Sequence, residues 1–200
     1  MPDQSKPITV LCTGDSITDC GRREDPDHLG YGYVRRLTVP GARIVNTGIG
    51  GDLSADLAAR WDRDVLAHSP DVLSVLIGIN DVWRRYDGAG QVTTAAEFAA
   101  NLRGSLSRLQ PGVRLILIEP FVLPVTEEQQ RWEAEDLGEK RATVRELATE
   151  FGAAFLPAQQ ILTAAAAREG AAAIAADGVH PTDRGHELLA QALDPLVNSF

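Results

Sequence analysis

The segment Ile8-Thr9-Val10-Leu11-Cys12-Thr13-Gly14-Asp15-Ser16-Ile17-Thr18 decides how the rest of the chain is interpreted. Its first part is short, apolar and rich in β-branched side chains, which is typical of a buried β-strand. A serine that follows such a strand lies at the rim of a sheet, where a substrate can reach its hydroxyl. Ser16 is therefore a candidate nucleophile. The alternative is a helix N-cap, a frequent position for serine in α/β proteins.

A candidate base lies near the other end of the chain, in Asp177-Gly178-Val179-His180-Pro181. A serine hydroxyl is inert near neutral pH until a base takes its proton, and a third group must hold that base in one tautomer. In a turn, the spacing of Asp177 and His180 lets the carboxylate reach the imidazole ring. His186 is a competing base, but it falls within the last expected helix, where a capping or surface role is favoured.

Short apolar segments without alternation predict parallel strands that are covered on both faces. They span residues 8–13, 43–46, 72–77, 113–119 and 154–156. Between them, apolar residues recur at helical spacing. These stripes consist of Leu53, Leu57, Trp61 and Val65; Phe98, Leu102, Leu106 and Leu109; Leu137, Val144, Leu147 and Phe151; and Leu188, Leu189, Ala192 and Leu193. Thr182 is a suitable N-cap for the last helix. The alanine-rich stretch 164–176 is expected to be a helix that frays near Gly170.

Alternating strands and helices predict a doubly wound parallel sheet in one domain, residues 1–200, with no linker or repeat. Such sheets bind ligands beyond the carboxyl ends of their strands. Ser16, Gly51 and Asn80 each follow an expected strand. The topology therefore predicts that these three residues meet at one rim of the sheet.

Two further blocks lie between the serine and the histidine: Asn46-Thr47-Gly48-Ile49-Gly50-Gly51-Asp52 and Gly78-Ile79-Asn80-Asp81. Together with Gly14-Asp15-Ser16 and the Asp177–His180 pair, they resemble, in order, the four motif blocks of the SGNH (GDSL-type) hydrolases. The resemblance covers the whole chain. It implies a three-layer α/β/α, flavodoxin-like fold with a five-stranded parallel sheet. The extensions at residues 19–22 and 82–84 look most like the acetylxylan-esterase branch.

The resemblance implies a serine esterase that needs no cofactor and no metal. Ser16 would form an acyl-enzyme, with His180 as base and Asp177 as its orienting partner. The backbone N–H groups of Ser16 and Gly51 and the amide of Asn80 would form the oxyanion hole, which lowers the barrier by stabilising developing negative charge. The expected substrates are short acyl esters, acetyl esters of carbohydrates such as acetylated xylo-oligosaccharides above all.

Asp15, Trp83 and Arg84 are candidate substrate-binding residues, because aromatic faces stack on sugar rings and arginine can bond to hydroxyls. Trp83 could equally pack beneath its loop. Ala176 departs from the acetylxylan-esterase pattern, in which a large aromatic residue is expected before the aspartate. The acids Asp15, Asp19, Asp52 and Asp81 could suggest Mg²⁺, but the serine, histidine and aspartate form a complete set without metal. These acids are instead expected to hydrogen-bond the loops around Ser16 and Asn80.

Composition narrows the range of partners. The chain has 19 basic and 28 acidic side chains and a net charge of −9, which argues against nucleic acid or an anionic membrane surface and favours a small, neutral ester substrate. Cys12 and Cys20 do not form a disulfide framework. The first six residues lack an apolar signal region and no apolar run reaches membrane-spanning length, so a cytoplasmic location is expected. The sequence does not decide whether the chain forms a homo-oligomer.

Three other functions remain open at this point. The first is a thioesterase or lysophospholipase of the same family that acts on longer acyl chains. The second is a non-catalytic carbohydrate-binding protein on an esterase scaffold, which is disfavoured because no catalytic position is substituted. The third is a metal-dependent, phosphatase-like protein, which sensitivity to chelators would reveal.

Overall fold

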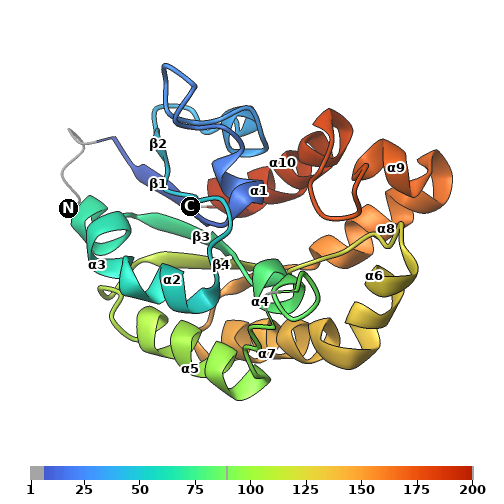
Figure 1. The fold of residues 1–200 in the computed structure, drawn as a ribbon. Helices are drawn as coiled ribbons and strands as arrows, with labels where there is room; N and C mark the ends of the chain where they lie inside the picture. Colours follow the sequence, from blue (N-terminus) through green and yellow to red (C-terminus); the bar gives the residue numbers. More distant parts are fainter. Residues whose placement is uncertain (1–6, 89, 200) are drawn as a thin grey trace.

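The computed structural model describes residues 7–88 and 90–199, so the N-terminal segment 1–6 that was inspected for a signal region lies outside the described part. Five strands form one parallel sheet in the order β2-β1-β3-β4-β5 (Figure 1). They are β1(Thr9–Gly14), β2(Arg43–Asn46), β3(Val72–Leu76), β4(Arg114–Ile118) and β5(Ala154–Leu156). Every strand boundary lies within one residue of its expected position. The predicted α/β fold with a five-stranded parallel sheet is confirmed.

Helices and short helical turns connect the strands. They are α1(Ser16–Asp19), η1(Val34–Arg36), α2(Ser54–Ala59), α3(Trp61–Asp64), η2(Leu66–His68), α4(Ile79–Trp83), α5(Ala95–Leu106), α6(Glu127–Trp132), the π-helical turn η3(Glu133–Leu137), α7(Gly138–Glu150), α8(Ala158–Glu169), α9(Ala171–Ile174) and α10(Asp183–Asn198). Among the described residues, no helix is both long enough and apolar enough to cross a membrane.

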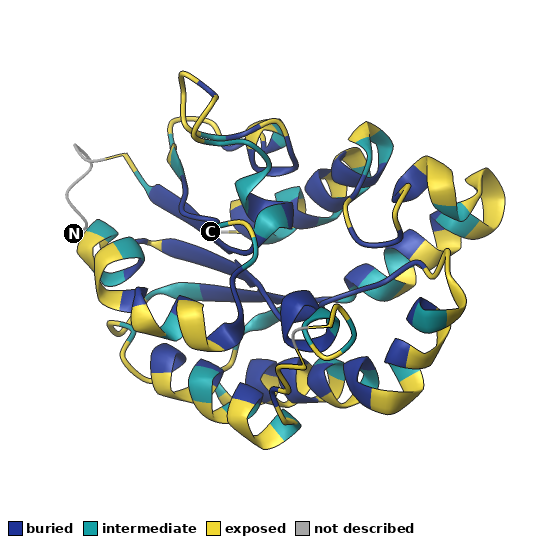
Figure 2. Cartoon of the chain, in the orientation of Figure 1, coloured by how far each residue is buried: buried dark blue, intermediate teal, exposed yellow. Residues whose placement is uncertain are grey.

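The two faces of the sheet bury two separate apolar clusters, because successive side chains of a strand point to opposite faces. On β3, Leu73 and Val75 belong to the cluster that contains residues of α2, α5 and α7. Val72 and Leu76 belong to the other cluster, which contains Leu189 and Leu193 of α10. Figure 1 shows α2, α5 and α7 on one side of the sheet and α10 on the other. Three layers result. The central strands β1, β3 and β4 are buried almost throughout, whereas the edge strands β2 and β5 are partly exposed (Figure 2).

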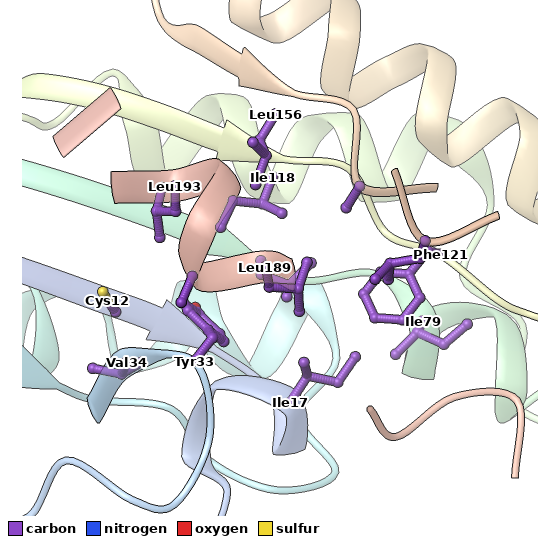
Figure 3. Close-up of a cluster of buried hydrophobic side chains, with 14 of the residues drawn as sticks. Cys12, Ile17, Tyr33, Val34, Ile79, Ile118, Phe121, Leu156, Leu189 and Leu193 are labelled. Atoms are coloured by element: carbon purple, nitrogen blue, oxygen red, sulfur yellow. The ribbon is translucent and has the colours of Figure 1, made fainter. Parts of the chain in front are cut away.

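The last helix closes the second layer. Thr182 caps it as expected, since its hydroxyl accepts a hydrogen bond from the N–H of Gly185 at 3.3 Å. Leu189 and Leu193 then point toward Tyr33 and toward the ends of β4 and β5 (Figure 3). The C-terminal helix is thereby packed against the segment that follows β1. This packing places the last helix beside η1.

Two expected helices are interrupted. The stripe from Leu53 to Val65 does not form one helix: α2 ends at Ala59, and Arg60 adopts φ −102° and ψ 5° between α2 and α3. The alanine-rich stretch is helical on both sides of Gly170, but it breaks at that residue, which has φ +92°. Periodicity alone could not reveal the break at Arg60, because the apolar residues keep their helical spacing across it.

Phe98 of α5 offers a test of how α5 packs against the segment that leads into α4. Its side chain is fully buried, and it packs against Gly78, the residue that precedes α4. We expect Phe98→Ala to lower the free energy of unfolding by about 3–5 kcal/mol, the usual cost of emptying a buried phenylalanine site. Urea denaturation of the purified variant measures this value. The exposed Val92→Ala is the control and should change stability by less than about 0.5 kcal/mol. A loss below about 1 kcal/mol for Phe98→Ala would contradict the packing.

Candidate active site

The carboxyl end of β1 leads directly into the short helix that carries Ser16. Gly14 has φ +155°, and a Cβ at this residue would lie 2.0 Å from the carbonyl oxygen of Leu76, so a side chain cannot be accommodated there. Asp15 caps α1 by accepting a hydrogen bond from the N–H of Ile17 at 3.0 Å. Ser16 is the first residue of α1, where the backbone N–H has no intrahelical acceptor. The helix thus begins at the half-buried serine, whose own N–H has no acceptor within the helix.

Ser16, His180 and Asp177 form one hydrogen-bonded chain. Ser16 Oγ lies 2.9 Å from His180 Nε2. His180 Nδ1 lies 2.6 Å from Asp177 Oδ2. This order assigns the Nδ1 hydrogen to the bond with the carboxylate and leaves Nε2 free to accept the serine proton. Residues that are 164 positions apart in the sequence therefore meet at hydrogen-bond distance.

Hydrogen bonds to the side chain and to the carbonyl oxygen of Asp177 fix the loop around it. Oδ1 of Asp177 accepts the N–H of Val179 at 2.9 Å and that of His180 at 2.7 Å. Gln129 donates its side-chain amide to the carbonyl oxygen of Asp177 at 2.7 Å. Burial alone would raise the pKa of Asp177, but the hydrogen bonds from the His180 ring and from the two N–H groups outweigh it. The net pKa lies below the usual value, which keeps the carboxylate ionised beside the imidazole.

His186 does not lie near Ser16, and the expected surface role is wrong. The ring is buried in the interior-facing side of α10. Nδ1 accepts the backbone N–H of Tyr33 at 3.2 Å, and Nε2 lies 3.4 Å from the sulfur of Cys20. Burial lowers the pKa of His186 to about 4, so this histidine is neutral at physiological pH and serves a packing role.

Gly51 and Asn80 meet Ser16 at the same rim. Gly51 has φ +86°, a backbone conformation that favours glycine. Within the described chain, the N–H of Gly51 has no hydrogen-bond partner, whereas its neighbours Ile49 and Asp52 donate to backbone carbonyls. Asn80 donates one amide hydrogen to the carbonyl oxygen of Asp52 at 3.0 Å. Because a side-chain amide carries two hydrogens, the second is available to a ligand in the pocket that Asn80 and Ser16 both line.

These residues enclose an open pocket of about 240 Å³, which is lined by Ser16, Gly51, Asn80, Trp83, Arg84 and His180. The Trp83 ring is half-buried, and its centroid is 5.9 Å from that of His180 and 5.8 Å from that of Trp132. It therefore packs against the core and also lines the pocket, and its substrate-binding role stays a prediction. Arg84 is held by Asp87 at 2.6 Å. Its other guanidinium nitrogen lies close to Gly51.

Comparison with known proteins identifies the family. Residues 12–188 match the model of the GDSL-like Lipase/Acylhydrolase family. The chain is a member of the GDSL-like hydrolases. An acetylxylan esterase from Geobacillus stearothermophilus is 36% identical over 92% of this chain and 90% of its own. A variant structure of an acetyl xylan esterase from that organism matches with a TM-score of 0.85 and 35% identity, covering 95% of this chain and 94% of the other. The structure of the acetylxylan esterase without this change gives a TM-score of 0.83 at 33% identity, covering 96% and 94%.

This GDSL-like hydrolase is a carboxylic ester hydrolase, as its sequence predicts. Structures of catalytic mutants of the Geobacillus esterase also match the chain; in them a serine, a histidine or an aspartate is replaced by alanine. Among residues 7–88 and 90–199, no group of three or more histidine, cysteine, aspartate or glutamate side chains could hold a metal ion.

Asp15 does not fit the substrate-binding role expected for it. Its side chain is fully buried behind Ser16, out of reach of the pocket. Burial raises the pKa of Asp15 to about 7, and the nearby charges of Asp81 and Asp52 add to this effect. Oδ2 of Asp15 has no hydrogen-bond partner among the described residues. The expectation that these acids bind the loops holds for Asp15, which caps α1.

Asp81 joins the two loops of the hydrolase that carry Gly51 and Asn80. Its carboxylate accepts the N–H of Ser54 at 2.9 Å and the hydroxyl of the same residue at 2.6 Å. Asp81 is fully buried, and burial raises its pKa while the bonds from Ser54 oppose the rise. The segment after Gly51 is thus tied to the start of α4.

Arg60 is a structural residue of the site that the sequence did not reveal. Its guanidinium donates to Asp52 Oδ2 and to the carbonyl of Thr47, each at 2.6 Å, and to the carbonyl of Gly14 at 2.9 Å. A further bond reaches Asp64 at 3.0 Å. The only sequence signal is a charged residue beside Trp61 in an apolar stripe, which is ordinary for a helix.

The raised pKa of Asp15 predicts how the stability of this hydrolase depends on pH. Between pH 4 and pH 7 the unfolded chain has an ionised carboxylate, whereas the folded chain keeps the proton. The stabilising contribution of Asp15 to the free energy of unfolding is therefore complete below about pH 4 and is lost as pH rises through about 7. Asp15→Asn keeps an acceptor for Ile17 but cannot titrate. From pH 5 to pH 7.5, we expect the wild type to lose about 2 kcal/mol more free energy of unfolding than this variant. Urea titrations at both pH values measure the difference. Parallel pH profiles would contradict the assignment.

Proposed function

We propose that this esterase removes acetyl groups from carbohydrates by a serine mechanism, with acetylated xylo-oligosaccharides as the substrate class. The observation that carries the proposal is the Ser16–His180–Asp177 chain beside a pocket that also contains Gly51 and Asn80. The likeness to an acetylxylan esterase and to a Geobacillus acetyl-xylooligosaccharide esterase supports the substrate class.

In the first half of the reaction, Ser16 Oγ attacks the ester carbonyl carbon while its proton passes to His180 Nε2. Asp177 accepts a hydrogen bond from the Nδ1–H group of His180, orients the ring and stabilises the imidazolium that forms. The carbonyl oxygen becomes an anion, which the N–H groups of Ser16 and Gly51 and the amide of Asn80 stabilise. The bond to the sugar oxygen then breaks, and His180 gives its proton to that oxygen.

In the second half, water attacks the acetyl-serine and gives its proton to His180. The same donors stabilise the second tetrahedral anion. When that intermediate collapses, acetate leaves and His180 returns the proton to Ser16 Oγ. Every proton that the imidazole takes is given back, so the cycle needs no cofactor.

The pocket walls favour a short acyl group. Among the described residues that line it, Trp83 is the only one with a large apolar side chain. A fatty chain would gain about 0.8 kcal/mol for each methylene that it buries, but this site offers little apolar surface for such burial. The Trp83 face suits a sugar ring, and the guanidinium of Arg84 can bond to sugar hydroxyls. Asp177 and His180 remain about half exposed, next to the exposed Ala176, which leaves this flank open for a bulky leaving group.

The mechanism predicts that Ser16→Ala lowers the turnover number at least about a thousandfold, the usual scale for loss of a triad nucleophile. Hydrolysis of p-nitrophenyl acetate by purified wild type and variant measures the loss. Circular dichroism confirms that the variant is folded. A folded variant with turnover near that of the wild type would refute the assignment of Ser16.

The pocket predicts a substrate profile that falls from acetate to butyrate and nearly vanishes by octanoate. A series of p-nitrophenyl esters gives kcat/KM for each chain length, and acetate release from acetylated xylo-oligosaccharides tests the carbohydrate, with Ser16→Ala as the blank. A maximum at octanoate or beyond would replace the proposal with a lipase or lysophospholipase. Good activity on p-nitrophenyl acetate without acetate release from the oligosaccharides would refute the xylo-oligosaccharide class only.

A further inference from the structure

The short helix α1 carries Ser16 at its first residue and an aspartate at its last. Asp19 Oδ2 accepts the backbone N–H of Gly50 at 3.0 Å, and Gly50 immediately precedes the candidate oxyanion donor Gly51. The Asp19 side chain is only 17% exposed, so little water competes for this bond. One element thus holds both the nucleophile and the loop that faces it.

Arg22 also bonds to this loop, at a residue two positions before Gly50. Its Nε donates to the carbonyl oxygen of Gly48 at 2.6 Å. The guanidinium also lies 3.7 Å from Asp19 Oδ1, and that oxygen accepts the N–H of Arg22 at 3.3 Å. Asp19 and Arg22 therefore orient one another while each bonds to a different peptide group of the loop. We call this arrangement the Asp19–Arg22 clamp.

The loop needs such a clamp because Gly50 and Gly51 are consecutive glycines. Glycine has the greatest backbone freedom, and holding it in one conformation costs the most entropy. Gly48 is fixed by Asn46, and Ile49 by the carbonyl of Gly14. Beyond Ile49, the bond from Gly50 to Asp19 is the next backbone anchor before Asp52. It restrains the peptide that presents the N–H of Gly51.

We propose that Asp19, with Arg22, is a positioning residue that orients the N–H of Gly51 toward the oxyanion. Neither residue lines the pocket, so neither is expected to touch the substrate. Preorganised donors stabilise the transition state more than the bound ester. The clamp should therefore affect kcat and leave KM nearly unchanged. This inference rests on the proposed function, since it assigns Gly51 to that oxyanion hole.

The test compares Asp19→Ala, Asp19→Asn and Arg22→Ala with the wild type on p-nitrophenyl acetate. Loss of one oxyanion donor costs about a hundredfold to a thousandfold in kcat, and a misoriented donor should cost less, about tenfold to a hundredfold for Asp19→Ala. KM should change less than about threefold. The amide oxygen of Asp19→Asn still accepts the N–H of Gly50, so this variant should stay within about fivefold of the wild type. Arg22→Ala should lower kcat by a smaller factor than Asp19→Ala, again without a change in KM.

Asp27→Ala is the matched control. Asp27 lies in the same segment and is 69% exposed, and it pairs with Arg35 rather than with the loop. Its kcat should equal that of the wild type. Inhibition by phenylboronic acid, whose serine adduct mimics the tetrahedral anion, gives a second readout. Its affinity should weaken in Asp19→Ala by a factor similar to the loss in kcat, which a merely structural role would not produce.

The outcomes separate this inference from the proposed function. If Ser16→Ala remains active, the proposed serine mechanism fails whatever the Asp19 variants do. If Ser16→Ala is inert but Asp19→Ala keeps kcat within twofold, only the clamp is refuted. A rise in KM without a fall in kcat also refutes it. If Asp19→Ala does not fold, the other two variants decide the test. A kcat of Arg22→Ala equal to that of the wild type overturns the proposal. A loss of kcat in Asp19→Asn as large as that for a missing oxyanion donor also overturns it.

Discussion

The buried guanidinium of Arg60 is the contact on which the rest of the site depends. It bonds at once to the carbonyl of Gly14 at the end of β1, to the carbonyl of Thr47 after β2 and to the carboxylate of Asp52. Planar, rigidly spaced donors allow arginine to join several acceptors in this way. Ser16 follows the first of these segments and Gly51 lies between the other two. One side chain therefore links the segments that carry the candidate nucleophile Ser16 and the candidate oxyanion donor Gly51.

A second group of buried polar residues is built around that contact. Asp15 and Asp81 are fully buried, and burial raises the pKa of both. Removing carboxylates from water is unfavourable unless hydrogen bonds compensate for it. Asp81 is compensated by Ser54, whereas one oxygen of Asp15 lacks a partner among the described residues. The fold tolerates the unfavourable burial of these two carboxyl groups beside Ser16, where their hydrogen bonds fix the loops of the candidate site.

The sequence predicted the parts of the molecule that depend on local signals. Strand positions follow from short apolar runs, and all five are correct to within one residue. The meeting of Ser16, Gly51 and Asn80 follows from parallel topology, because the ends of parallel strands share one edge. The Asp177–His180 bond follows from a spacing of three residues in a turn. These features need no knowledge of side-chain packing.

Features that depend on packing could not be predicted in the same way. Arg60 adjoins an apolar stripe, and nothing in the spacing indicates that its guanidinium turns inward or that the helix breaks there. His186 was expected to have a capping or surface role, because the direction in which a side chain of α10 points is unknown until the helix is docked. Asp15 was a candidate substrate-binding residue, yet its side chain turns into the interior to cap α1. Each error concerns the direction of a side chain, which only the tertiary structure determines.

The contact between Ser16 and His180 links residues separated by 164 positions in the chain. During synthesis on the ribosome, the serine therefore emerges well before the histidine. An unfinished chain therefore cannot assemble the hydrogen-bonded pair, however well β1 has folded. Contacts of such large sequence separation form late and slowly, since a long loop must close first. If Ser16 and His180 act as proposed, esterase activity reports that the chain has been made and folded at least as far as His180, and a chain that stops before this residue is inactive.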